Sequence, residues 1–112
     1  MAKYVIGDLC NCLSDDEWEA FCNRDVIPDG VYIFRTAYGD GTYIGSDGFA
    51  YGVDSGTIGI CPLDKVSAPD KLREALKYRV VQIVDIDEIA EESVSEKDGV
   101  ITFDKVIIDT AA

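Results

Sequence analysis

The sequence contains no histidine, and this absence excludes several classes of chemistry. Hydrolases of the Ser-His-Asp and Cys-His types need an imidazole, and so do metal sites built on histidine. Acid or base catalysis near neutral pH would have to use carboxylates, tyrosine, cysteine or lysine with shifted pKa values. Among these residue types, only the aspartates occur in an arrangement that suggests a site.

Positive charge is also scarce. The chain has 10 lysine and arginine residues against 22 aspartate and glutamate residues, which gives a formal net charge of -12. Non-specific association with DNA or RNA depends on cations that neutralise phosphates, so this charge balance opposes it. We therefore expect no direct binding to nucleic acid.

Long uncharged apolar stretches are missing as well. No segment approaches the roughly 18 residues of a membrane span, and residues 1–8 lack the apolar run of a secretory signal. We expect a cytoplasmic protein that does not contact a membrane. In a reducing compartment Cys10, Cys12, Cys22 and Cys61 are expected to be free thiols. Their spacing lacks the paired C-x-x-C knuckles of structural zinc, and we predict no cofactor.

The remaining composition favours one folded domain over residues 1–112. Apolar residues make up 47% of the chain, which is enough to form one hydrophobic core. Short β-rich runs between turn residues predict strands, and we expect the run 31–37 to be the central one. The predicted strands are residues 4–6, 31–37, 42–44, 49–51, 57–60, 80–86, 100–103 and 105–108.

Capping signals predict two short helices. Ser14 and Glu17 form a capping box ahead of a helix over 15–23, in which each side chain satisfies a backbone N–H. Leu13 and Trp18 occupy the positions of a hydrophobic staple at the same helix start.

The second helix is predicted from residue 68 or 69 to residue 77. Ser67 and Asp70 are positioned to cap it, and Pro69 is tolerated in its first turn.

Glycine is concentrated in the middle of the chain, where residues 38–59 hold seven of the ten. Asp40-Gly41 and Asp47-Gly48 are typical of type I′ hairpin turns, and Lys97-Asp98-Gly99 predicts a further hairpin. We expect the middle segment to form a meander of tightly turned strands. Taken together, the patterns predict an α+β fold, with a curled, mainly antiparallel sheet of six to eight short strands and two short helices.

Six short motifs occur in order along nearly the whole chain. They are Val5-Ile6-Gly7-Asp8-x-Cys10, Asp16-Glu17-Trp18, Thr36-Ala37-Tyr38-Gly39-Asp40-Gly41-x-Tyr43, Val53-Asp54-Ser55-Gly56-Thr57-Ile58-Gly59-Ile60, Asp98-Gly99-Val100 and Val106-Ile107-Ile108-Asp109-Thr110. Taken in this order, the motifs resemble a largely uncharacterised family of small proteins encoded in bacteriophage and bacterial genomes. The resemblance implies a phage or mobile-element context, and hence the host cytoplasm, but it supplies no known activity or catalytic residues.

The first functional hypothesis follows from the charge. Two dense acidic runs, residues 15–25 and 85–98, could imitate a phosphate backbone to a basic host protein, as an inhibitor of a nucleic-acid-handling or defence protein would. The same runs could instead be solvated faces that keep a small domain soluble. The partner-binding candidates in these runs are Asp15, Asp16, Glu19, Asp87, Glu88, Glu91 and Glu92.

The second hypothesis concerns Asp8, Asp40 and Asp54, with Ser55 adjacent to the last. Three converging carboxylates could hold Mg²⁺ or Ca²⁺ and support metal-assisted hydrolysis. Each residue lies beside glycine or in a predicted turn, so each could equally cap its own backbone.

The third hypothesis is structural, as a small accessory protein of a virus particle or an oligomer subunit. Tyr38, Tyr43, Phe49 and Tyr51 would then form the contact surface, because aromatic residues are enriched in interface cores. The same residues could belong to the protein's own core. Of the three hypotheses, we favour the non-enzymatic interaction protein.

Overall fold

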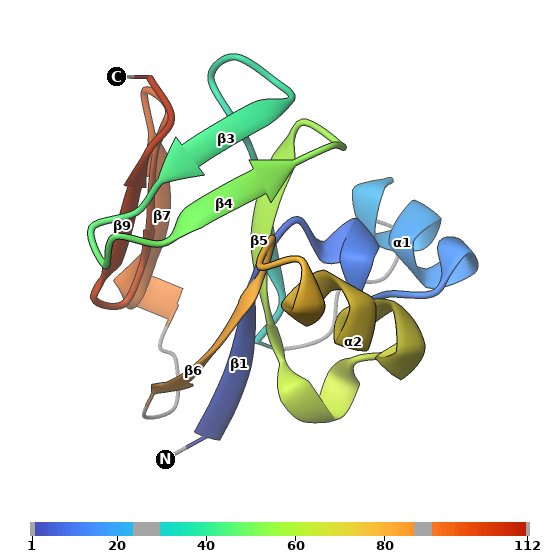
Figure 1. Ribbon diagram of the computed structural model, residues 1–112. Coiled ribbons are helices and arrows are strands. Elements are labelled where there is room, and N and C mark those ends of the chain that lie inside the picture. Colours follow the sequence, from blue (N-terminus) through green and yellow to red (C-terminus); the bar gives the residue numbers. More distant parts are fainter. Residues whose placement is uncertain (1, 24–29, 87–90, 112) are drawn as a thin grey trace.

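A four-stranded antiparallel sheet forms the middle layer of the computed structural model, which describes residues 2–23, 30–86 and 91–111 (Figure 1). Its strand order is β2-β5-β1-β6, so β5 and β1 each have a neighbour on both sides. The strands are β1 (Ala2–Gly7), β2 (Tyr32–Arg35), β5 (Thr57–Pro62) and β6 (Gln82–Ile86).

The remaining strands cover one face of this sheet. A two-stranded hairpin of β3 (Gly41–Ile44) and β4 (Ala50–Val53) lies beside a three-stranded meander. The backbone N–H of Ser46 donates to the carbonyl of Ile107 at 2.7 Å, and this bond joins the hairpin to the meander. The meander consists of β7 (Val94–Lys97), β8 (Val100–Phe103) and β9 (Val106–Asp109).

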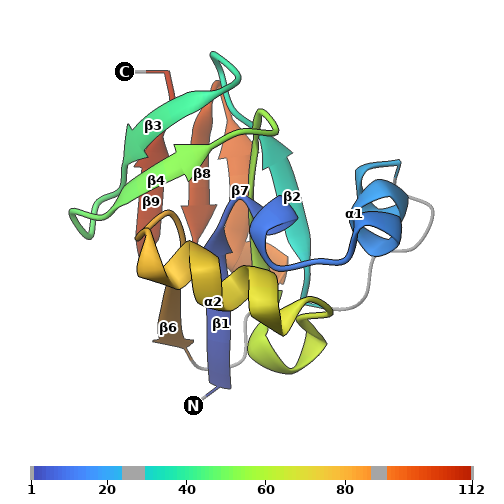
Figure 2. The same ribbon diagram turned by 45° about the vertical axis from the view of Figure 1, so that its right-hand side comes forward.

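Two helices cover the opposite face of the middle sheet, as Figures 1 and 2 show. They are α1 (Asp15–Cys22) and α2 (Pro69–Lys77). Short 3-10 turns complete the described chain: η1 (Leu9–Asn11), η2 (Leu63–Lys65) and η3 (Glu91–Ser93). Within the described residues, no helix has both the length and the apolar character needed to cross a membrane.

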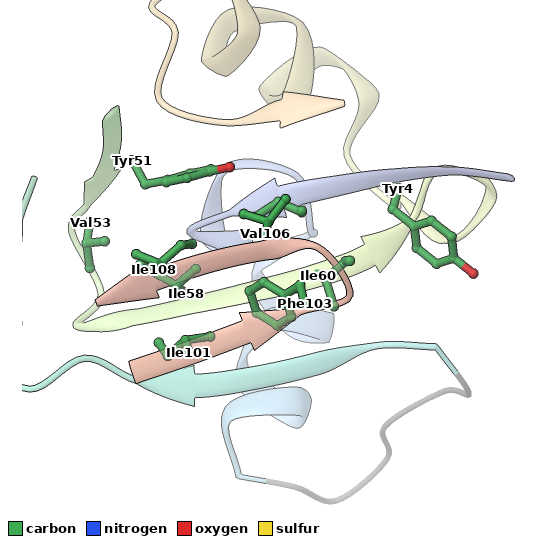
Figure 3. Packing of buried hydrophobic residues seen from close by; sticks show 10 residues of the cluster. Tyr4, Tyr51, Val53, Ile58, Ile60, Ile101, Phe103, Val106 and Ile108 are labelled. Carbon is green, nitrogen blue, oxygen red and sulfur yellow. The ribbon is translucent and has the colours of Figure 1, made fainter. Parts of the chain in front are cut away.

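Alternation along the middle strands creates two hydrophobic cores, one on each face. Along β1, Tyr4 and Ile6 point to the outer strands, whereas Val5 points to the helices. The core beneath the outer strands includes Ile60 and Phe103 and is shown in Figure 3. The middle sheet is therefore buried on both faces.

The predicted α+β class, with mainly antiparallel short strands and two helices, is confirmed. The predicted position of the run 31–37 is wrong, because β2 lies at the edge of the middle sheet and β1 and β5 are its centre. The predicted meander over 38–59 is also wrong. Only β3 and β4 pair there, and β5 crosses to pair with β1 and β2.

One of the predicted turns is confirmed, and the predicted type of two others is wrong. Asp98 and Gly99 have φ of 53° and 86° between the paired residues Lys97 and Val100, which confirms that hairpin. A type I′ turn needs positive φ at both central residues, and neither Asp40 nor Asp47 has it, so the type I′ prediction at those two sites is wrong.

The helix caps are confirmed in part. The Ser14 hydroxyl accepts from the Glu17 N–H at 3.3 Å, as predicted. The reciprocal half of the capping box is wrong, because the Ser14 N–H donates to the Ser67 hydroxyl oxygen at 2.8 Å. Ser67 therefore does not cap α2, whose N-cap is Ala68 with no side-chain bond. The N–H of Ala68 instead donates to the carbonyl of Cys12 at 3.0 Å.

Candidate functional site

Asp8 is the one buried carboxylate among the described residues, with 0% of its surface exposed. It follows β1 directly after Gly7, whose φ of 148° favours glycine. A Cβ at Gly7 would also lie 2.6 Å from Cγ1 of Val81, so no larger residue fits there. The chain therefore turns sharply out of the middle sheet and carries the Asp8 side chain into the interior.

Four donors saturate this carboxylate, and we call the arrangement the Asp8 hub. Oδ2 accepts from the N–H groups of Asp54 and Ser55, both at 2.8 Å. Oδ1 accepts from the Ser55 hydroxyl at 2.8 Å and from the Cys10 N–H at 3.2 Å. A buried carboxylate needs such donors, because it has lost its hydration. The hub joins η1 to the turn between β4 and β5, which are 46 residues apart in sequence.

The three aspartates of the metal hypothesis do not form a ligand cluster. Asp40 and Asp54 expose their side chains, while Asp8 is buried and committed to its hub. Among the described residues, no three histidine, cysteine, aspartate or glutamate side chains are grouped so that they could hold a metal ion. Asp54 contributes its backbone N–H to the hub, and Ser55 contributes both its N–H and its hydroxyl.

A second polar arrangement fixes the loop after β2. The Thr36 hydroxyl donates to the carbonyl of Gly39 at 2.6 Å, and the Tyr43 hydroxyl donates to the same carbonyl at 2.8 Å. The Thr36 N–H donates to the carbonyl of Gly56 at 3.0 Å, which attaches this loop to the β4–β5 turn. Tyr43 is half-buried, so its ring and hydroxyl are largely committed within the molecule.

Thr110 fixes the C-terminal end of the meander and was missed by the sequence reasoning. The residue is 1% exposed, and its hydroxyl donates to the carbonyl of Gly99 and accepts from the N–H of Ala37 at 2.9 Å. We call this contact the Thr110 clamp. Together with the Asp8 hub, it gives structural roles to several of the motifs that carry the family resemblance.

The predicted aromatic contact surface is wrong for Tyr51. This side chain is 0% exposed and lies in the core beneath the outer strands (Figure 3). Its hydroxyl donates to Oδ2 of Asp47 at 3.0 Å, and burial raises its pKa above the ordinary tyrosine value. Phe49 is half-buried against the same core, whereas Tyr38 is 72% exposed.

The acidic partner-binding candidates lie mainly on the surface where the structure describes them. Asp15, Asp16 and Glu19 are exposed on α1, and Glu92 is exposed in η3. The candidates Asp87 and Glu88, with the side chain of Glu91, lie outside the described residues.

A groove of about 560 Å³ lies beside α2, and we call it the α2 groove. Sequence reasoning missed it, although the spacing of Asp70, Glu74 and Tyr78 places these residues on one stripe of the helix. The residues that line it are Asn11, Asp54, Asp70, Lys71, Glu74, Ala75, Tyr78 and Val80.

The described cysteines are unsuited to nucleophilic chemistry. Cys10, Cys12 and Cys61 are free thiols, as predicted. Burial is the main cause that raises the pKa of each to about 12, and the adjacent Asp8 carboxylate adds to the effect at Cys10. The thiolate is the reactive form, so the raised pKa values disfavour reaction of these side chains near neutral pH.

Comparisons with known proteins give no information about the family or the function of this chain. Neither protein-family models, nor curated proteins, nor solved structures give a match to this chain. The resemblance to the phage and bacterial family therefore stays a prediction, and the site has to be interpreted from its own geometry.

Proposed function

We propose that the protein is a non-enzymatic binding domain that presents an acidic surface to a basic partner protein. The observation that carries this proposal is the amount of uncompensated surface charge. Among the described residues, only Asp15, Asp70 and Asp85 have a lysine or arginine within ion-pair distance. Apart from Asp8, no described carboxylate is buried, so most of them face solvent without a cationic partner.

The catalytic alternative has less support from the geometry. An aspartate acting as a metal ligand or general base needs a free oxygen, and both oxygens of Asp8 already accept two hydrogen bonds each. Asp40 and Asp54 are exposed and do not converge with it on a common point. The buried thiols have raised pKa values, and the sequence has no histidine to activate a nucleophile.

The nature of the partner follows from the sign of the charge. A protein with a formal net charge of -12 attracts basic proteins, and proteins that handle nucleic acids carry basic grooves. Carboxylates can occupy such a groove in place of phosphates. With the phage context that the family resemblance implies, this supports an inhibitor of a host nucleic-acid-handling or defence protein.

The experiment combines identification of a partner with a competition assay. The tagged protein is used to capture host proteins near physiological salt, and a captured protein is purified and titrated with it. We expect the affinity to fall as salt is raised and to fall again when duplex DNA is added, because both ligands need the same basic surface.

A matched pair of variants tests whether the surface charge matters. Neutralising α1 with Asp15→Asn, Asp16→Asn and Glu19→Gln should weaken binding about tenfold. The triple change Asp64→Asn, Asp104→Asn and Asp109→Asn removes the same charge from exposed positions outside both acidic runs and should have little effect. Asparagine tolerates the positive φ of 56° at Asp104. An affinity that does not change with salt, with added DNA or with the α1 substitutions would contradict the proposal.

A further inference from the structure

The α2 groove has walls from three separate segments. Asn11 comes from η1, Asp54 from the β4–β5 turn, and most of the remaining lining from α2. Its volume of about 560 Å³ lies within the range of roughly 300–1,000 Å³ for sites that hold small ligands. The space is therefore suited to one or two side chains of a partner and is too small to hold a folded element.

Negative charge dominates the groove. Asp54 and Glu74 have no ion-pair partner among the described residues, whereas Asp70 pairs with Arg73 at 3.3 Å on the exposed rim. The cation in the lining is Lys71, and its ammonium is directed toward α1. There it donates to the carbonyl of Leu13 at 3.0 Å and pairs with Asp15 at 3.2 Å. Two carboxylates thus remain unneutralised within the groove.

The aromatic ring of Tyr78 also lines the groove. Tyr78 is 69% exposed, which is unusual for a large side chain with an apolar ring. The ammonium of Lys77 lies 5.8 Å from the centroid of this ring, so the ring already contacts a cation. Arginine stacks on aromatic rings and binds carboxylates through two parallel N–H donors, whereas lysine acts as a point charge.

Contacts with the rest of the molecule hold the segments that line the groove in place. The backbone of Asp54 is fixed by its bond to Asp8, and the start of α2 is fixed by the bond from Ala68 to Cys12. A Cβ at Gly52 would lie 3.1 Å from Cγ1 of Val80, so β4 packs closely against the lining residue Val80, which follows α2. A preformed site loses less free energy on binding than one that must be ordered.

We propose that the α2 groove binds an arginine side chain in a basic segment of the partner protein. The guanidinium lies between the carboxylates of Asp54 and Glu74 and stacks against Tyr78. This inference rests on the proposed function, because it supposes a basic partner. It adds the location of the contact and the residue type that is recognised.

The test uses a fluorescein-labelled peptide with two adjacent arginines between glycines, titrated by fluorescence anisotropy near physiological salt. A second peptide replaces both arginines with citrulline, which keeps the shape and removes the charge. We expect the arginine peptide to bind the wild-type protein and the citrulline peptide to bind at least about tenfold more weakly.

Variants then locate the binding. Asp54→Asn with Glu74→Gln should raise the Kd about tenfold, and Tyr78→Ala should raise it severalfold. The matched control, Glu96→Gln with Asp104→Asn, removes the same charge from the meander and should change the Kd less than about twofold. All these side chains are exposed, so the variants are expected to fold.

The possible outcomes separate the two proposals. Equal weakening by the groove and control variants would mean that only net charge matters, which overturns the groove and leaves the proposed function standing. Absence of arginine-peptide binding also overturns the groove, while the captured partner tests the proposed function on its own. Equal binding of the citrulline peptide would overturn arginine recognition.

Discussion

Substitution of Asp8 offers the sharpest test of the structural reasoning. Asp8→Ala removes the acceptor of three backbone N–H groups and one hydroxyl. The Ser55 hydroxyl keeps a partner, because it also lies 2.7 Å from the Thr57 hydroxyl. Each of the three N–H groups left without an acceptor costs about 1–2 kcal/mol, so the expected loss is about 3–6 kcal/mol. That is a large part of the total stability of a small domain, roughly 5–15 kcal/mol.

Asp8→Asn should be much milder, for a geometric reason. The two shortest N–H bonds converge on Oδ2, and an amide oxygen in that position can accept both. The amide nitrogen then replaces Oδ1, where it opposes the Cys10 N–H but can donate to the Ser55 hydroxyl. One hydrogen bond and the charge assistance are lost, which predicts a destabilisation of about 1–2 kcal/mol.

Urea unfolding followed by the fluorescence of Trp18, the single tryptophan, measures both effects. Trp18 packs against the core on the helix side, so its emission reports on global unfolding. The control is Asp54→Ala, which removes an exposed carboxylate from the same turn but keeps the backbone N–H, and should change stability by less than about 0.5 kcal/mol. Equal losses for the Ala and Asn variants of Asp8, or a loss that appears only with Mg²⁺ or Ca²⁺ present, would refute the reasoning.

Three further predictions concern the helix cap and the thiols. Ser14→Ala should lower stability by about 1 kcal/mol in urea unfolding, and Ser67→Ala should also be destabilising, because each hydroxyl accepts a backbone N–H at the start of α1. An unchanged midpoint for both would contradict these roles. Folding raises the thiol pKa values of Cys10, Cys12 and Cys61 to about 12, which means that the folded state favours the protonated thiols. Their contribution to the free energy of unfolding is therefore fully present below about pH 9. It should be lost as pH rises toward 12, by up to about 1.4 kcal/mol per pH unit for each of the fully buried thiols Cys12 and Cys61. A flat profile of urea midpoints above about pH 9 would count against this. Finally, all four cysteines should be alkylated after denaturation without reductant, whereas in the native state Cys12 and Cys61, both 0% exposed, should react slowly. Protection of two or four thiols after denaturation would demonstrate disulfides.

Local patterns explain which parts of the fold could be predicted from sequence. The Ser14 cap depends on residues three positions apart, and the Asp98-Gly99 hairpin on two adjacent residues, so both signals are contained in short segments. The β-rich run 4–6, which ends at Gly7-Asp8, likewise shows a strand within a few residues. These predictions were confirmed because no distant segment competes for the groups involved.

The errors arose where a distant segment decides the outcome. The capping box failed because Ser67, 53 residues away, supplies the acceptor that Glu17 was expected to supply. The run 31–37 has the composition of a central strand, but the pairing order places it at the edge of the sheet, and composition alone carries no information about neighbours.

The candidate site was also hard to predict, because it depends on segments that are distant in sequence. Asp8 was selected with two other aspartates as a possible metal ligand, since sequence alone cannot show that its oxygens are saturated by residues 46 and 47 positions away. Tyr51 carried a usable signal, because its alternation with Val53 places both on one face of β4, and both are buried. The α2 groove needs Asp54 and α2 to come together, which only the tertiary structure shows.

Asp54 connects the Asp8 hub to the α2 groove, because its N–H donates to Asp8 and the same residue lines the groove. The β4–β5 turn consists of Asp54, Ser55 and Gly56, so hydrophobic burial contributes little to its order, and glycine carries a large entropic cost on ordering. Directional hydrogen bonds that this turn donates to one buried carboxylate can order it, because each bond fixes both a distance and an orientation. The bond to the Asp54 N–H leaves that residue's own carboxylate exposed at the groove. A buried acidic side chain thus fixes the position of an exposed one, and the loop motifs determine the geometry of the surface proposed to bind a partner.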